Sequence, residues 1–142
     1  MHKDIDHYLL DKGTNAKIRK EVRWEPPQPG LLKLNVDGSC NSRRGIGAGG
    51  LIQDGKGNWL VGFSSNDGQG DVLIAELFAI YHGIILLLQH EYSKAIIESD
   101  SLEAIQLLTR RNELEIHEYS SLLFRITSLI DHAPDLVLHH IF

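Results

Sequence analysis

The spacing of hydrophobic and polar positions changes near residue 71, and this change separates a strand-forming half of the chain from a mostly helical half. Before that point, short apolar segments bounded by glycine, asparagine and aspartate predict strands at 31–40, 48–54 and 58–65. The link at 54–58, Asp-Gly-Lys-Gly-Asn, contains residues that tolerate a positive φ, as a tight hairpin requires. We therefore expect an antiparallel meander.

Helical spacing dominates the second half. Asp71 has the residue type of an N-cap, and residues 72–91 place apolar side chains on nearly every face, so we expect a central, buried helix there. Further elements are predicted as a strand at 94–99, helices at 101–111 and 116–131, and a strand at 135–142. Pro134 stops the last helix. The order β-β-β-α-β-α-α-β predicts an α/β fold, a mixed sheet with helices packed on it.

The N-terminal part of the chain has a different character. Residues 1–23 are mixed in charge and weakly periodic, and we expect a tail or linker outside the domain. Residues 24–30 contain three prolines, which are incompatible with a helix interior or a central strand, so they predict an extended lead-in. The domain is therefore expected to span 24–142, a length at which one hydrophobic core forms without staples.

Composition narrows the class of protein. A hydrophobic fraction of 42% and a charged fraction of 23% are ordinary for a globular protein. Cys40 is the only cysteine, which excludes an internal disulfide, and the start of the chain is too polar for a signal peptide. We therefore expect an intracellular location, nuclear or cytoplasmic, and no secretion. The longest apolar run, 83–88, is too short to cross a bilayer, so no membrane partner is expected.

Charge gives no general sign of nucleic-acid binding. Residues 31–142 hold eight Lys or Arg and fourteen Asp or Glu, a net charge of −6. A polyanionic substrate would have to be met by local cations or by a metal ion, because no overall positive field attracts it. The pairs Arg43-Arg44 and Arg110-Arg111 are candidate phosphate contacts, although any solvated loop can hold such pairs.

Three acidic residues stand where an unpaired carboxylate is costly. Asp37 follows an apolar strand, Glu76 is the only formally charged residue in the apolar stretch 72–88, and Asp100 closes the strand at 94–99. No Lys or Arg adjoins them, so a shared divalent cation is an economical explanation. Oxygen ligands suit Mg²⁺ or Mn²⁺ better than zinc, and two such ions assist hydrolysis of a phosphodiester.

Each of these acids also has a simpler explanation. Asp37 followed by Gly38 and Ser39 is ordinary turn chemistry. Asp100 could cap the helix that follows, with Glu103 completing a capping box. Glu76 could occupy a partially exposed position. The metal hypothesis requires the central helix to pack across the first and fourth strands, so that the three carboxylates converge.

Other motifs carry less. The glycines at 45–50 satisfy G-x-G-x-x-G, but a strand and a hairpin follow them where a dinucleotide site needs a helix, so a nucleotide cofactor is rejected. His82, on the buried helix, is expected to be a core residue with a satisfied ring. His139 and His140 should point to opposite faces of a strand. A packed thiol is expected at Cys40.

The sequence resembles the plant reverse-transcriptase-like branch of type 1 ribonuclease H domains. The resemblance begins with Trp24-x-Pro26-Pro27-x-x-Gly30-x-Leu32-Lys33-Leu34-Asn35-Val36-Asp37-Gly38-Ser39. Further matches follow in the family's order at 47–54, 75–80 and 98–101, so the similarity spans 24–142. It implies the ribonuclease H-like fold, a five-stranded mixed sheet whose first three strands are antiparallel, with helices on its faces.

The resemblance also implies an activity, hydrolysis of the RNA strand of an RNA–DNA hybrid with Mg²⁺ or Mn²⁺, two ions being expected. It assigns Asp37, Glu76 and Asp100 as catalytic, metal-binding carboxylates, with Asp37 bridging both ions and Glu76 facing the ion on the leaving-group side. Contacts to the hybrid, which the family reads by shape and by the 2′-hydroxyl, are expected from Gly38, Ser39 and Ser101.

The chain also departs from the family's pattern. It stops at Ile141-Phe142, before the family's Arg-Glu-Ala-Asn loop and the helix that bears a fourth metal-binding aspartate. Asp135 precedes the last strand and is misplaced for that role. We therefore expect a domain truncated before its last helix, with impaired activity. A non-catalytic nucleic-acid-binding or interaction module and a dimerising scaffold stay open as alternatives, and the sequence leaves the oligomeric state undecided.

Overall fold

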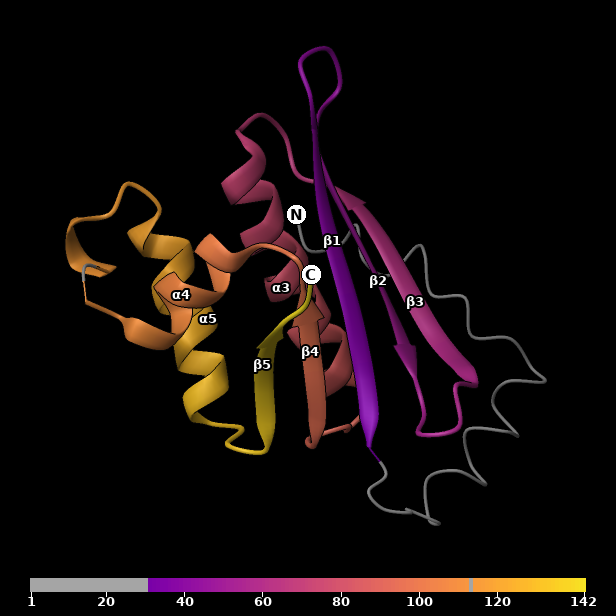
Figure 1. The fold of residues 1–142 in the computed structure, drawn as a ribbon. Helices are drawn as coiled ribbons and strands as arrows, with labels where there is room; N and C mark the ends of the chain where they lie inside the picture. The colour runs from indigo at the N-terminus through magenta and orange to yellow at the C-terminus, as the bar shows by residue number, and fades with distance from the viewer. Residues whose placement is uncertain (1–30, 113) are drawn as a thin grey trace.

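The computed structural model describes residues 31–112 and 114–142 (Figure 1). The expectations for the N-terminal tail and for the proline-rich lead-in lie outside these residues. In the described part, five strands form one sheet in the order β3-β2-β1-β4-β5. The strands are β1 (Leu32–Asn41), β2 (Gly45–Gln53), β3 (Trp59–Asn66), β4 (Ala95–Ser99) and β5 (Leu136–His140). Pairing is antiparallel from β1 through β3, and parallel between β1 and β4 and between β4 and β5. The predicted mixed sheet is confirmed.

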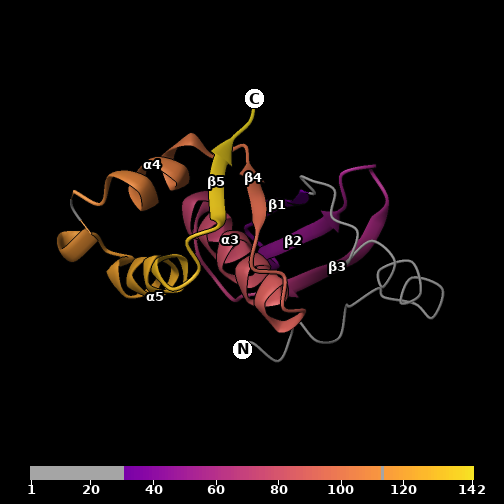
Figure 2. The same ribbon diagram turned by 90° about the horizontal axis from the view of Figure 1, so that it is seen from below.

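Within residues 31–112 and 114–142, three helices cover one face of this sheet (Figure 2). They are α3 (Val72–Gln89), α4 (Leu102–Arg110) and α5 (Ser120–Asp131), and a 3₁₀ turn, η1 (Leu114–Ile116), lies between the last two. The predicted helix at 116–131 is therefore wrong at its start. The ring Nδ1 of His117 accepts the backbone N–H of Tyr119 at 3.1 Å, which closes a local turn before α5 begins. Ile116 and Tyr119 continue the apolar spacing of α5 across this turn, so the pattern alone did not separate the turn from the helix.

Helix α3 is the centre of the fold. Asp71 caps it as predicted, accepting the backbone N–H of Ile74 at 2.9 Å. The helix is long and apolar enough to cross a membrane by length and composition alone, but 67% of it is buried inside the fold, and this burial explains its apolar character. Gly83 permits the close contact with β1, since a Cβ there would lie 2.6 Å from Leu34 Cδ2.

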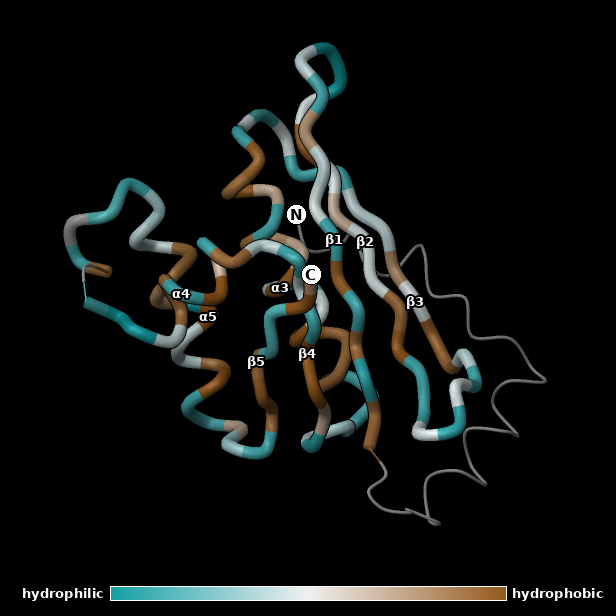
Figure 3. Tube along the Cα trace, in the orientation of Figure 1, coloured by the Kyte–Doolittle hydropathy of each residue, from teal (hydrophilic) through white to brown (hydrophobic). Residues whose placement is uncertain are grey.

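The core lies between α3 and the helix-facing side of the sheet. Leu34, Ile52, Ile80 and Ile97 are fully buried in it. Figure 3 shows apolar segments alternating with hydrophilic ones along the strands, and hydrophilic colour at the tip of the β1–β2 hairpin. The glycines at 45–50 lie inside β2, which begins at Gly45, earlier than the predicted 48. The G-x-G-x-x-G pattern therefore lies in a strand and is not followed by a helix, which agrees with the rejection of a dinucleotide site.

Candidate metal centre between β1, α3 and β4

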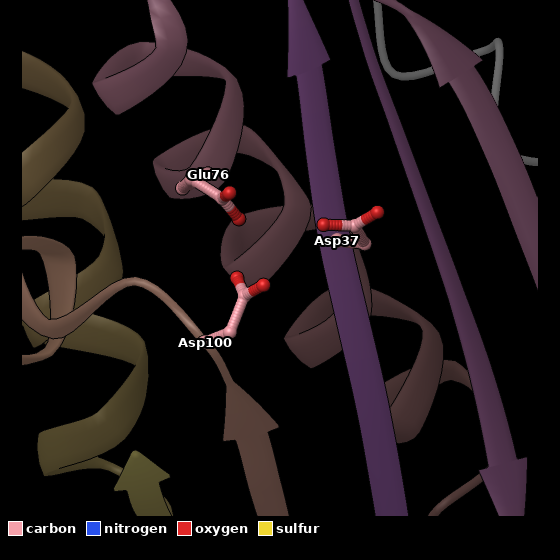
Figure 4. Close-up of side chains that lie close together, drawn as sticks. All are labelled: Asp37, Glu76 and Asp100. Carbon is pink, nitrogen blue, oxygen red and sulfur yellow. The ribbon is translucent and has the colours of Figure 1, made fainter. Parts of the chain in front are cut away.

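The carboxylates of Asp37, Glu76 and Asp100 converge at one point. One oxygen from each lies within 4.8 Å of the others. Figure 4 shows the three side chains pointing toward one another from β1, from the second turn of α3 and from the residue directly after β4. The geometric expectation from the sequence is confirmed. The roles of these residues in catalysis stay a prediction, developed below.

Strand geometry explains how a helix residue reaches this point. The pairing of β1 with β4 ends at Asn35 and Glu98, and beyond that pair the two strands are no longer paired. The Glu76 carboxylate occupies the space that opens there, and its Oε1 accepts the backbone N–H of Gly38 at 3.1 Å. A side chain of α3 thus takes the hydrogen bond that a neighbouring strand would otherwise provide.

Gly38 makes this approach of α3 to β1 possible. A Cβ at this position would lie 2.4 Å from the carbonyl carbon and oxygen of Ala75, both backbone atoms. Glycine is therefore required for the helix to come close enough for Glu76 to bond β1. The turn explanation for Asp37 is wrong, because β1 continues without a turn to Asn41.

The capping explanation for Asp100 is also wrong. The N-cap of α4 is Ser101, whose Oγ accepts the backbone N–H of Ala104 at 3.2 Å. Ser99 Oγ accepts the N–H of Ser101 at 3.1 Å and holds the short link between β4 and α4. Because Ser101 provides the cap, the Asp100 carboxylate projects into the acidic cluster.

The cluster is electrostatically unfavourable without a cation. Burial raises the pKa of Glu76 to about 7, partly opposed by the Gly38 N–H, and the charges of Asp100 and Asp37 raise it further. The pKa of Asp37 is also raised, first by burial and then by the charge of Asp100. Glu76 is only 6% exposed, so the partially exposed explanation is wrong. In the described part of the chain, no Lys, Arg or His forms an ion pair with these acids.

This donor set fits a hard divalent cation. It offers carboxylate oxygens from three elements, with no histidine or cysteine among them. A cation bound there would remove the mutual repulsion that raises the pKa of Glu76. Asp37 and Asp100 are exposed while Glu76 is buried, so the cluster has a solvent-facing side and a protein-facing side.

The predicted substrate contacts lie beside the cluster. Ser39 is exposed on β1 and Ser101 is half-buried at the start of α4. Because the Gly38 N–H already bonds Glu76, only its carbonyl is left for a substrate. The role of these three residues in binding stays a prediction.

The hydrogen bonding of the buried histidine in α3 goes beyond what the sequence predicted. His82 is a fully buried core residue as expected, and its Nε2 lies 2.7 Å from Oδ1 of Asp67, a partner that sequence analysis missed. Its Nδ1 has no hydrogen-bond partner among the described residues, so the expected satisfied ring is confirmed at one nitrogen only. The signal was available, because a histidine in the middle of an apolar helix needs a polar partner.

Cys40 is exposed, contrary to the prediction of a packed thiol, and its Sγ lies 3.2 Å from the carbonyl oxygen of Gly70. The histidines of β5 are as expected on different faces, His139 exposed and His140 half-buried.

Comparison with known proteins agrees with the fold. Residues 35–142 match the profile of a family described as reverse transcriptase-like. A protein of Arabidopsis thaliana, named as a predicted ribonuclease H protein, is 32% identical over 89 residues, which are 62% of this chain. The matched part is 14% of that protein, so the chain spans a small fraction of its relative's length.

Solved structures of ribonuclease H1 share the architecture. LC11-RNase H1, isolated from compost by a metagenomic approach, superimposes with a TM-score of 0.68 at 21% identity, covering 79% of this chain and 84% of its own. The same protein was crystallised with an RNA/DNA hybrid. Ribonuclease H1 of Halobacterium salinarum gives a TM-score of 0.65 at 17% identity, covering 79% and 86% of the two chains. At such identities the likeness establishes the fold. The chain belongs to the reverse-transcriptase-like family and has the ribonuclease H-like fold.

Proposed function

We propose that this chain is a nuclease domain that hydrolyses the RNA strand of an RNA–DNA hybrid, using Mg²⁺ or Mn²⁺ held by Asp37, Glu76 and Asp100. The observation that carries the proposal is the convergence of their oxygens within 4.8 Å, in a cluster whose charges call for a cation. The name of the Arabidopsis relative supports the reaction. The complex of LC11-RNase H1 with a hybrid supports the substrate.

The residues of the chain have distinct tasks in this proposal. Glu76 is fixed by the Gly38 N–H and supplies the protein-facing ligand, whereas Asp37 and Asp100 face the solvent from which the hybrid arrives. Divalent ions held by this cluster, two if the site is filled as the resemblance implies, would activate water and stabilise the leaving oxygen of a phosphodiester. Ser39 and Ser101 lie where a hydroxyl is available to the sugar–phosphate backbone, and the carbonyl of Gly38 can accept a bond from a 2′-hydroxyl.

Cleavage of a hybrid whose RNA strand carries a 5′ label tests the proposal. We expect cutting with Mg²⁺ or Mn²⁺ and none with a chelator. Asp37→Asn and Asp100→Asn should each lower the rate by roughly a hundredfold or more, because each removes a carboxylate that would hold the divalent cation on which the hydrolysis depends. Asp135→Asn is the matched control, since Asp135 is an exposed acid in the turn just before β5. It should leave the rate unchanged.

Calorimetry separates the enzyme from a non-catalytic module with the same fold. If the wild-type protein binds Mn²⁺ and cleaves the hybrid, and Glu76→Gln loses both properties, the nuclease is supported. Hybrid binding without cleavage and without metal binding would instead establish a binding module that retains the acids. Absence of both cleavage and hybrid binding in correctly folded protein would overturn the proposed function.

A further inference from the structure

The hairpin between β1 and β2 carries two adjacent arginines at its tip. Arg43 and Arg44 are exposed, and neither forms an ion pair with another residue that the structure describes. Elsewhere, Arg111 is engaged by Asp131 and Lys33 lies 3.8 Å from Glu98. Because residues 31–142 have a net charge of −6, this pair is a local concentration of positive charge on an acidic chain.

The turn that presents the two arginines is fixed by its own hydrogen bonds. Asn41 Oδ1 accepts the backbone N–H of Arg43 at 2.8 Å and that of Arg44 at 3.0 Å. An asparagine side chain that bonds the backbone ahead of it in this way holds a turn in one conformation. The two guanidinium groups therefore start from an ordered backbone.

The base of the hairpin is braced by the loop between β3 and α3. The backbone N–H of Ile46 donates to the carbonyl of Gly68 at 2.7 Å, and the N–H of Asp67 donates to the carbonyl of Ile46 at 3.0 Å. Gly45 has a φ of +90°, and a Cβ there would lie 2.1 Å from Gly68 O. The brace itself is anchored, since the Asp67 carboxylate bonds the fully buried ring of His82.

The hairpin continues β1 past the acidic cluster. Asn41 lies four positions after Asp37 along β1, which is about 13 Å at the rise of a strand. Figure 1 shows the hairpin projecting beyond the rest of the sheet, at the same end as the C-terminal end of β4, which leads into Asp100. Since each strand of a duplex carries one phosphate for roughly every 3.4 Å of the helix axis, the tip lies within reach of a phosphate a few nucleotides from the cluster.

We propose that the β1–β2 hairpin is an arm whose Arg43 and Arg44 bind the phosphate backbone of the duplex that the acidic cluster cuts. The proposal rests on the proposed function and specifies how an acidic chain holds its substrate. Guanidinium groups form paired hydrogen bonds with phosphate oxygens. Contacts of this kind supply affinity without base recognition, as suits an enzyme that reads the shape of a hybrid.

Fluorescence anisotropy over a series of salt concentrations tests the arm. The probe is a labelled 20-base-pair RNA–DNA hybrid, and the whole chain carries Asp37→Asn, so that the probe survives in Mg²⁺. The test variant adds Arg43→Gln and Arg44→Gln. The control variant adds Lys56→Gln and Lys94→Gln, which remove the same charge from exposed positions in the β2–β3 turn and just before β4. Thermal melting checks that each variant is folded.

We expect the arginine variant to bind the hybrid roughly tenfold more weakly and to lose about two from the slope of log K against log salt, while the lysine variant stays close to the parent. Equal losses in both variants, or no loss in the arginine variant, would overturn the arm and leave the proposed function standing. A folded parent that binds no hybrid at all would overturn the proposed function, and the arm with it.

Discussion

Glu76 combines two demands that oppose each other. It is nearly buried on α3, which favours the protonated form and raises its pKa to about 7, yet a metal ligand must be ionised. The Gly38 N–H offsets part of this conflict by favouring the carboxylate. The acidity of one side chain therefore sets the pH range in which the site is ready for a cation.

We predict that metal-free protein loses stability as pH rises from 5 to 8 because of Glu76. Its folded pKa of about 7 lies above the ordinary value of 4.5, so its contribution is fully present below pH 4.5 and is lost as pH rises through 7. Glu76→Gln, which keeps an oxygen for Gly38, should remove this loss. Its stability relative to wild type should rise between pH 5 and pH 8 by up to about 3 kcal/mol. Urea unfolding in a chelator at both pH values measures it, and an unchanged difference would contradict the assignment.

At the scale of elements, the close contact between β1 and α3 determines whether the carboxylates of the site can meet. We predict that Gly38→Ala lowers the free energy of unfolding by about 2 kcal/mol or more, since its Cβ overlaps backbone atoms of Ala75 that have no rotamer to change. The variant should also bind Mn²⁺ more weakly, because α3 must move away from β1.

Gly49→Ala on β2 is the matched control for this substitution. Its Cβ would lie 3.6 Å from the carbonyl oxygen of Phe63, an ordinary contact, and its φ is not positive. We expect a change within about 0.5 kcal/mol. Chemical denaturation of both variants gives the comparison, and equal effects at the two glycines would show that the close approach at Gly38 is unimportant.

The buried pair of Asp67 and His82 ties the β3–α3 loop to the core. We predict that Asp67→Ala lowers stability by about 3 kcal/mol, because it leaves the Nε2 of a fully buried ring without its partner. Adding His82→Phe should recover part of the loss, since the ring stacks on Phe78 and is packed in apolar surroundings. Thermal unfolding of the single and double variants measures this. If the loss of stability in the double variant equals the sum of the losses in the two single variants, the pairing is refuted.

At the scale of the whole molecule, cation binding and folding are linked. We predict that Mg²⁺ at about a hundredfold excess over its dissociation constant stabilises the fold by about 2.7 kcal/mol, because only the folded chain brings the three carboxylates together. Proton competition at Glu76 should make the stabilisation smaller at pH 6 than at pH 8. Calorimetric melting with MgCl₂ or with a chelator measures it. A melting temperature that Mg²⁺ raises as much in Glu76→Gln as in wild type would place the ion elsewhere.

Local rules predicted the elements well where one signal acted alone. Asp71 was found as the cap of α3 because its residue type and the apolar run after it agreed. The same local rules gave the wrong assignment where two signals coincided. Asp100 and Ser101 are both good capping residues, and only the path of the chain after β4 gives the cap to Ser101. The start of α5 was misplaced because a 3₁₀ turn kept the apolar spacing of a helix.

The sequence by itself determined the type and order of the elements, since hydrophobic period and capping are local properties of neighbouring residues. It also determined which carboxylates are costly to bury, and so named the members of the site. Only the tertiary structure decided that β1 and β4 separate after Asn35 and Glu98, that Gly38 admits α3, and that Glu76 occupies the gap. Each of these features depends on contacts between residues far apart in the chain. The packing of the whole sheet against α3 sets those contacts.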